Sequence, residues 1–257
     1  MISHPHRCIF IHIPKNGGAS IERLIWNKEE RTVDNLWMGF THPHHNAYQT
    51  GALQHLFATN VRKAVGVDTY RDFYTFSMVR NPWDRTVSQY LYLFKRPDLQ
   101  QFLGCDDQVS FREYLQLIQR TPHVHWQAQH LFLNDERGKL MVDYIARFED
   151  YQSSVETIME SIHYPKDRPR RTDLEIPHLN RSKRKPYYYY YAPETAQLVA
   201  NIYAQDITQF GYTFEDPRPA GVDRTPLPFP IDRTPIAAPK KTLLDRMKRK
   251  LSRLLHG

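Results

Sequence analysis

The sequence predicts an α/β fold of three layers, in which a mainly parallel sheet is flanked by helices on both faces. Short apolar runs recur along residues 1–215, helical patterns separate them, and glycine or proline stands at several junctions. Strands that alternate with helices pair in parallel, because each helix returns the chain to the edge where the strand began. At 257 residues the chain can hold one such domain, 1–215, and a C-terminal extension.

The predicted elements follow one another in the order that this fold requires. Residues 8–13 form a continuous apolar run, typical of a strand buried on both faces, and a helical pattern then extends to about residue 27. A second helix is predicted over 50–65 and a second buried strand over 73–79. Further predictions are a helix that starts at 82, a strand over 140–148, a helix to about 162 and a last helix over 193–210.

The net charge of +7 is concentrated in the C-terminal extension. Residues 218–257 contain ten Lys or Arg and three Asp, whereas residues 1–217 contain 25 basic and 25 acidic residues. The domain itself is therefore neutral, and nothing in it favours nucleic acid as a partner.

The extension divides into two parts. Residues 216–239 hold seven of the 18 prolines, a composition that favours an extended linker over packed structure. Residues 240–257 are predicted to form a basic amphipathic helix, because Met247 and several leucines line one face of 240–255 and Lys or Arg fill most of the rest. That pattern is typical of a helix on an anionic membrane surface. The alternatives are a helix docked on protein and a disordered basic end.

Cysteine usage and hydropathy bear on the compartment. The chain has only Cys8, in a predicted buried strand, and Cys105, which argues against a disulfide framework. No apolar stretch reaches the roughly 18–20 residues of a membrane-spanning helix. Because residues 1–7 lead directly into the first strand, no signal peptide is expected. These features predict a cytoplasmic protein, which the basic helix would hold at the inner face of the membrane.

The first motif that carries chemistry lies between the first strand and its helix. Gly17 and Gly18 would let the backbone approach a phosphate, and free N–H groups at the helix start would point at it. Lys15 adds a positive charge and Ser20 a hydroxyl. An ordinary turn with an exposed lysine explains the bare pattern equally well. A nucleotide-hydrolase P-loop carries Lys-Ser/Thr after its last glycine, so this loop is predicted to bind an anion without a metal.

The second motif starts where the strand over 73–79 ends. Arg80 stands at the carboxyl end of that strand, where open α/β sheets bind ligands. Asn81 can cap the next helix and Pro82 suits its first position. Ser88 leans back toward Arg80, because helical side chains tilt toward the N-terminus. The two motifs together suit a nucleotide with phosphates at both its 5′ and 3′ ends.

These motifs resemble those of the family-2 sulfotransferases, which include carbohydrate and heparan sulfate 2-O-sulfotransferases. Residues 10–20 are similar to the family's 5′-phosphosulfate loop, and residues 76–90 to its 3′-phosphate motif. Weaker similarities occur at 147–149, at 178–183 and at 206–212, so the resemblance spans about 8–214. It departs from the family where threonine is common, at Asn16 and Ala19.

The resemblance implies a P-loop-like fold and metal-free, in-line transfer of a sulfuryl group from 3′-phosphoadenosine 5′-phosphosulfate (PAPS) to an acceptor hydroxyl, on a glycan or glycolipid. Lys15 would stabilise the leaving oxygen, and His55 would be the general base. The implied PAPS-binding residues are Lys15, Asn16, Gly17, Gly18, Ala19, Ser20, Arg80, Ser88, Arg181, Ser182 and Lys183.

Several residues leave alternatives open. His42, His44 and His45 compete with His55 for the role of base, and they suit a polar loop over the site better than a metal centre. Gln127 and Gln129 are weak candidates for acceptor binding, and residues 187–191 could stack on a sugar or pack inside. Arg147 and Glu149 are expected to be structural.

Two competing functions come from other classes. One is a phosphotransferase that uses a nucleoside triphosphate, and the other is a non-catalytic nucleotide-binding module tethered to a membrane. The loop has no Lys-Ser/Thr after its glycines and the chain has no clear magnesium carboxylate, which disfavours the first. Lys15, Arg80 and His55 in one chain favour catalysis over the second.

Overall fold

The core of the molecule is a four-stranded sheet with the order β1-β2-β3-β4, seen in a computed structural model that describes residues 1–26, 29–37, 53–162 and 184–234. Strands β2 (Cys8–Ile11), β3 (Tyr74–Val79) and β4 (Tyr144–Arg147) are parallel. The short β1 (Ile2–Ser3) pairs antiparallel with β2. The predicted mainly parallel sheet is therefore confirmed.

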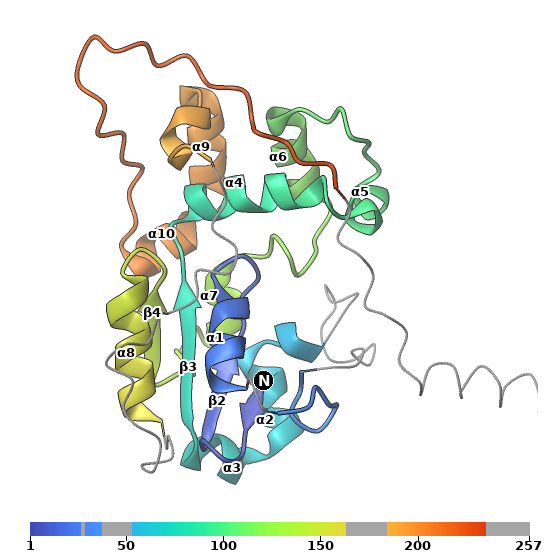
Figure 1. The fold of residues 1–257 in the computed structure, drawn as a ribbon, viewed down its shortest axis with the longest axis vertical. Coiled ribbons are helices and arrows are strands. Elements are labelled where there is room, and N and C mark those ends of the chain that lie inside the picture. The colour runs from blue at the N-terminus through green and yellow to red at the C-terminus, as the bar shows by residue number, and fades with distance from the viewer. Residues whose placement is uncertain (27–28, 38–52, 163–183, 235–257) are drawn as a thin grey trace, which may run out of the picture.

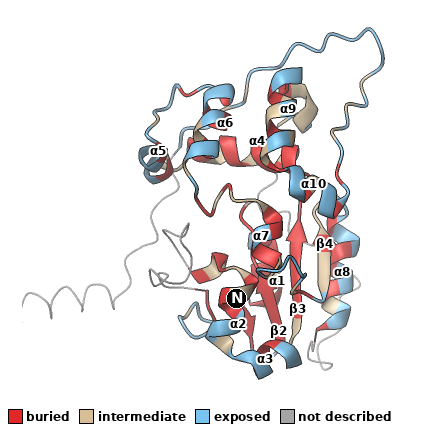
Figure 2. Ribbon diagram, turned by 180° about the vertical axis from the view of Figure 1, so that it is seen from behind, coloured by how far each residue is buried: buried red, intermediate tan, exposed pale blue. Residues whose placement is uncertain are grey.

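Helices cover both faces of the sheet and complete the three layers (Figure 1). On one face, α1 (Gly18–Ile25) and α8 (Tyr151–Ser161) pack in a cluster with Phe10 and Phe76. On the other face, α2 (Ala58–Val65) and α7 (Gln129–Leu133) pack in a cluster with Ile9 and Ile11. Successive strand residues point to opposite faces, so the β2 run is apolar throughout because both faces are buried (Figure 2).

The remaining helices lie mainly beyond the carboxyl ends of the parallel strands. Helix α4 (Pro82–Leu93) leaves β3 there and joins a helical cap that also contains α5 (Pro97–Leu103), α6 (Phe111–Arg120) and α9 (Pro193–Ile202) (Figure 1). Helix α3 (Val67–Asp72) precedes β3, and α10 (Ala204–Phe210) follows α9. Two 3₁₀ turns, η1 (Leu53–His55) and η2 (Tyr187–Tyr190), complete the described elements.

Three predicted elements are shorter or divided in the structure. The helix predicted over 50–65 consists, in its described part, of η1 and α2, because the chain turns at Leu56 and Phe57. The strand predicted over 140–148 begins at Tyr144, since Leu140 pairs instead with Asn134 in an isolated bridge. The helix predicted over 193–210 is interrupted at Tyr203, whose φ and ψ of −114° and 28° are not helical.

Residues 216–234 contain no helix or strand, in line with their proline content, but they are not a free spacer. They run back over the helical cap (Figure 1). The ring of Phe229 stacks on Tyr190 at 4.6 Å, and Asp232 forms an ion pair with Lys95. The segment is extended, as predicted for a proline-rich linker, but as far as Thr234 it also contacts the domain, which its composition did not favour. The predicted basic helix lies outside the described residues. In the part of the chain that is described, no helix is long and apolar enough to cross a membrane.

Candidate active site

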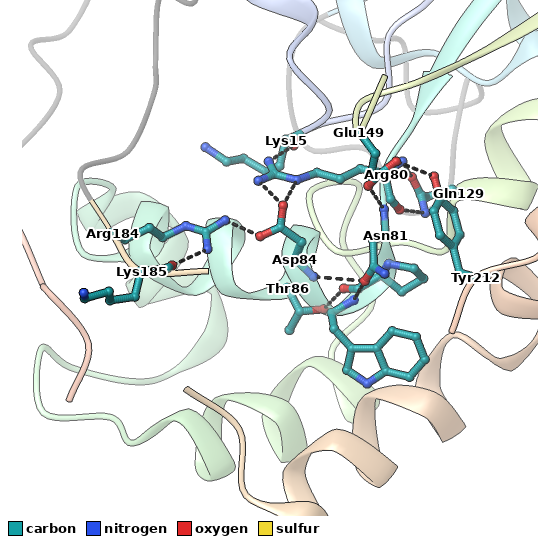
Figure 3. A network of polar contacts seen from close by, with 12 residues as sticks. Lys15, Arg80, Asn81, Asp84, Thr86, Gln129, Glu149, Arg184, Lys185 and Tyr212 are labelled. Atoms are coloured by element: carbon teal, nitrogen blue, oxygen red, sulfur yellow. Dashed lines mark hydrogen bonds and ion pairs between the residues drawn. The ribbon is translucent and has the colours of Figure 1, made fainter. Parts of the chain in front are cut away.

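The two predicted anion-binding turns lie side by side at the carboxyl end of the sheet. Strands β2 and β3 are parallel neighbours, with Ile11 opposite Ser77, so their following turns leave the sheet at the same level. Arg80, just after β3, donates a hydrogen bond from Nη1 to the carbonyl of Lys15, just after β2, at 2.8 Å. Figure 3 shows this contact. The sheet thus brings together two segments that are 65 residues apart in the sequence.

Close packing explains the two glycines of the first turn. A Cβ at Gly18 would lie 2.1 Å from Nε2 of His12, which no side chain could tolerate. Gly17 has a φ of 81°, in the left-handed region, and precedes α1 as its N-cap. No side chain caps α1, and although the N–H of Ser20 donates to the carbonyl of Gly17 at 3.1 Å, the N–H groups of Gly18 and Ala19 remain available to an anion. Ala19 is exposed in this turn, and Ser20 is buried and shares a hydrogen bond with Tyr151.

Lys15 is the cation of this turn, and it lies in a strongly positive environment. Its side chain is partly buried, and Nζ lies 3.9 Å from the centre of the Tyr92 ring. Burial, followed by the charges of Arg80, Lys95, Arg96 and Arg184, lowers the pKa of Lys15 to about 7. An anion bound here would therefore relieve repulsion among the cations and favour the charged form of Lys15.

The second turn supplies charge from side chains. Asn81 caps α4 by accepting hydrogen bonds from the N–H groups of Trp83 and Asp84, as predicted. Arg80 binds Oδ2 of Asp84 through Nε and Nη2, at 2.9 and 2.7 Å, and Arg184 binds Oδ1 (Figure 3). Burial opposes ionisation of Asp84, but the charges of Arg80 and Arg184 lower its pKa. Two arginines share one carboxylate, so the turn keeps a net positive charge.

A buried amide ties the two turns together. Gln129, at the start of α7, is fully buried and bonds both main-chain groups of Arg80: Nε2 donates to the carbonyl and Oε1 accepts from the N–H, each at 2.9 Å. Oε1 also accepts from Nδ2 of Asn16 at 2.8 Å. Gln129 is therefore a structural link, whereas the sequence suggested an acceptor-binding role. The side chain of Asn16 points into the protein, so only its backbone can serve a ligand.

Arg85 is a second link that sequence patterns did not reveal. It is 3% exposed, and its Nε donates to the carbonyl of Pro14 at 3.1 Å. Its other nitrogens donate to the carbonyls of His125 and Gln127. Arg85 lies on α4, one residue after Asp84, so α4 holds both turns and the segment before α7. Ser88, also on α4, is partly buried.

His55 differs from its prediction in position but keeps features that suit a base. It was expected on the polar side of a helix, but it lies in η1 and is 7% exposed. Its Nδ1 is 3.0 Å from the carbonyl of His12, which can only accept, so Nδ1 carries the proton. The lone pair of Nε2 accepts a hydrogen bond from the side-chain amide of Gln54 at 3.2 Å, so Gln54 has to release Nε2 before it can take a proton. Burial, followed by the nearby charge of His12, lowers the pKa of His55 to about 3. The ring is therefore neutral at physiological pH.

The carboxylate of Glu22 interacts with His12, which in turn contacts His55. The rings of His12 and His55 meet edge to face, with centroids 4.6 Å apart. Nδ1 of His12 is 2.9 Å from Oε1 of Glu22, an ion-pair distance, although the ring N–H does not point along a hydrogen-bond line. Glu22 also accepts from the indole of Trp37 at 2.9 Å. His12, the middle residue of the group Glu22–His12–His55, is also the side chain that packs against Gly18.

The later motifs, at 147–149 and 206–212, form hydrogen bonds that support the site. Glu149 accepts from the N–H of Asn81 and from the hydroxyl of Tyr212, and Arg147 donates to the carbonyl of Phe210, in keeping with the structural roles expected for both. Of residues 187–191, Tyr190 and Tyr191 are buried and pack inside the cap. His42, His44, His45, Arg181, Ser182 and Lys183 lie outside the described residues. Within the described ranges, no group of three His, Cys, Asp or Glu could hold a metal ion.

The donor set fits a nucleotide that carries anionic groups at two ends. One turn offers uncapped helix N–H groups and Lys15, and the other offers Arg80 and Arg184 around a single carboxylate. Their spacing is fixed by the β2–β3 pairing and by Gln129. PAPS has this charge pattern, with a phosphosulfate at its 5′ end and a phosphate at its 3′ end.

Comparisons with known proteins agree with this geometry. The sequence profile of the Sulfotransferase family matches residues 1–213. An uncharacterized protein of Archaeoglobus fulgidus is 29% identical over 108 residues, which are 42% of this chain and 82% of the archaeal protein. No solved structure matches the chain. Since the family profile spans the sheet, both turns and the residues that link them, the chain belongs to the family-2 sulfotransferases and is a PAPS-dependent sulfotransferase.

Proposed function

We propose that this sulfotransferase acts on a carbohydrate hydroxyl, with His55 as the general base. The observation that carries the assignment of the base is the hydrogen bond between Nδ1 of His55 and the carbonyl of His12. It fixes the tautomer in which Nε2 can accept a proton. The low pKa of His55 keeps the ring unprotonated at neutral pH but also makes the free imidazole a weak base, so the proposal requires that the bound anionic nucleotide raise this pKa.

The proposed step is one in-line displacement. His55 takes the proton of the acceptor hydroxyl as the acceptor oxygen bonds to sulfur. The bond between sulfur and the bridging oxygen of the phosphosulfate breaks, and its electron pair stays on the departing phosphate. Lys15 stabilises that growing charge, which appears mainly in the transition state. No metal takes part in this proposal, so transfer should persist in the presence of a chelator.

The binding roles are divided between the two turns. The turn at 14–20 would hold the 5′-phosphosulfate through the N–H groups of α1 and Lys15. Arg80 and Ser88 would hold the 3′-phosphate, and the family resemblance adds Arg181, Ser182 and Lys183 as further binding residues. The similarity of both motifs to carbohydrate sulfotransferases supports a glycan or glycolipid as the acceptor.

The test is to incubate the full chain with sulfur-labelled PAPS and a panel of glycans, glycolipids, simple alcohols and phenols. Mass spectrometry would identify the labelled product and its position. A sulfated sugar hydroxyl, formed equally well with a chelator present, is the expected result. A product found only among phenols or simple alcohols would contradict the acceptor class, and loss of activity with the chelator would contradict the metal-free step.

We also propose that residues 240–255 bind an anionic membrane surface, so that the enzyme is peripheral at the inner face of the membrane in the cytoplasm. Six apolar residues at helical spacing and seven Lys or Arg support this proposal. The matched control is a chain that ends at Thr234, because residues 216–234 pack on the domain and should be kept. In co-sedimentation with anionic vesicles, the full chain should bind and high salt should release it. Equal binding of both chains would contradict the proposal.

A further inference from the structure

His125 is a partly buried histidine that has no role in the proposed mechanism. It lies between α6 and α7, and its ring contacts two residues of the site. One contact is edge-on with His55, with centroids 5.6 Å apart and planes at 68°. The other is a stack on Tyr92, also at 5.6 Å, with planes at 22°. His125 therefore borders the proposed base directly.

Tyr92 lies between His125 and Lys15, the residue proposed to stabilise the leaving oxygen. The same Tyr92 ring that stacks on His125 lies 3.9 Å from Nζ of Lys15. The rings of His125 and Tyr92 thus form a continuous wall from His55 to Lys15. These four side chains come from four separate segments, so their meeting is a product of the fold.

The main chain of His125 makes hydrogen bonds through both its N–H and its carbonyl, while ring Nδ1 is left without a polar partner in the described part of the chain. Its N–H donates to Nδ1 of His123 at 3.2 Å, and its carbonyl accepts from Nη2 of Arg85 at 3.3 Å. Within the described residues, ring Nδ1 is buried and makes no hydrogen bond. A buried polar atom without a partner is unfavourable and calls for an explanation, such as a ligand that completes it.

The position of His125 suggests what that ligand is. In an in-line displacement, the leaving oxygen and the attacking oxygen lie at opposite ends of one line. In the proposed step, Lys15 stabilises the leaving oxygen and His55 takes the proton of the attacking oxygen. The ring of His125 borders His55 directly and the Lys15 end through Tyr92, so it lies beside this line, where the three sulfuryl oxygens that do not react are placed.

We propose that His125 is a further catalytic residue, whose ring N–H donates a hydrogen bond to one of these sulfuryl oxygens. The inference rests on the roles proposed above for Lys15 and His55. Burial, followed by the charges of His55 and His123, holds the pKa of His125 well below its usual value. The ring is therefore neutral and has one N–H to donate. The His125 ring neither gains nor loses a proton, so the transfer step proposed above keeps the same reactants and products.

The experiment compares binding of PAPS with binding of 3′-phosphoadenosine 5′-phosphate (PAP), which lacks the sulfuryl group, by calorimetry on the full chain. His125→Phe keeps a ring but removes the N–H. It should weaken PAPS by about tenfold and leave PAP unchanged. His125→Gln restores an N–H donor and should regain part of the lost affinity. The matched control is His4→Phe, an exposed histidine in edge contact with Phe73, which should change neither affinity.

Three outcomes would overturn the inference. Unchanged PAPS affinity in His125→Phe would mean that no such contact exists. Equal weakening of PAPS and PAP would mean that the ring only supports the site. The same selective loss in His4→Phe would mean that the effect is not local. The affinity difference does not depend on which residue is the base, so failure of the His55 proposal would leave this result interpretable.

Discussion

The two turns that end β2 and β3 are built in different ways, although each joins a parallel strand to a helix. The turn at 14–20 is defined by missing side-chain atoms: Gly18 leaves room for the ring of His12, and no side chain caps α1. The turn at 80–88 depends on charge: Asn81 uses the first N–H groups of α4, and Arg80 and Arg184 surround Asp84. The first turn therefore presents backbone donors and one reactive lysine, and the second presents a fixed cationic surface.

This difference predicts a division of labour. Changes beside the first turn should affect the chemical step, whereas changes in the second should affect binding of the nucleotide.

The largest effect is expected from His55→Ala, which removes the proposed base beside the first turn. Transfer should fall by about 10²–10⁴-fold, the usual contribution of a general base. Affinity for PAP should remain nearly intact, because His55 bonds the carbonyl of His12 and touches neither cationic group of the second turn. Single-turnover kinetics and calorimetry measure the two quantities. A loss of only a few fold would move the role of base to His42, His44 or His45.

Lys15→Ala should lower turnover by about 10²–10³-fold, because charge on the leaving oxygen appears chiefly in the transition state. Its effect on PAP affinity should be much smaller. Comparison of kcat with the calorimetric affinity of the same variant checks this. Near-normal turnover would remove Lys15 from the mechanism.

Gln129→Leu tests the link between the turns. The variant leaves the main-chain groups of Arg80 and the amide of Asn16 without their partner. The free energy of unfolding should fall by about 1–3 kcal/mol, and PAP affinity should fall with it. Denaturant titration gives the first quantity and calorimetry the second. Weaker PAP binding with unchanged stability would contradict a structural role.

The pH dependence of binding should be the smallest effect. The free protein holds the pKa of Lys15 at about 7 because burial and neighbouring cations disfavour its charge. A bound anion raises that pKa, so binding takes up a proton above pH 7 and weakens as the pH rises. If binding restores the ordinary pKa, affinity should fall by about fivefold between pH 7 and pH 8. Calorimetry in buffers of different ionisation enthalpy detects the proton, and affinity that rises with pH would contradict the sign.

The sequence predicts the parts of the site that depend on local patterns. Gly17, Gly18 and Lys15 follow an apolar strand, and Arg80, Asn81 and Pro82 do the same, so both turns and their shared edge could be predicted. The capping box of α6, formed by Ser110 and Glu113, is another local pattern of this kind.

The parts that could not be predicted depend on contacts between distant segments. Asn16 and Gln129 are 113 residues apart and Arg85 and Pro14 are 71 apart, and neither pair has a local signature. His55 faces inward because the chain turns at Leu56 and Phe57, which interrupts the predicted helical face. Likewise, the proline content of 216–234 predicts an extended chain but not the contact of Phe229 with Tyr190.

The division of labour between the two turns is tested most directly by measuring which turn binds the 3′-phosphate of the nucleotide. PAP and adenosine 5′-monophosphate differ only in the 3′-phosphate, and calorimetry gives their affinities for the wild type, Arg80→Ala and Lys15→Ala. The wild type and Lys15→Ala should both prefer PAP by about 10- to 100-fold, the contribution of a charged hydrogen-bonded contact. Arg80→Ala should lose most of that preference. Equal affinity of the wild type for the two nucleotides, or a preference that Arg80→Ala keeps and Lys15→Ala loses, would contradict the account.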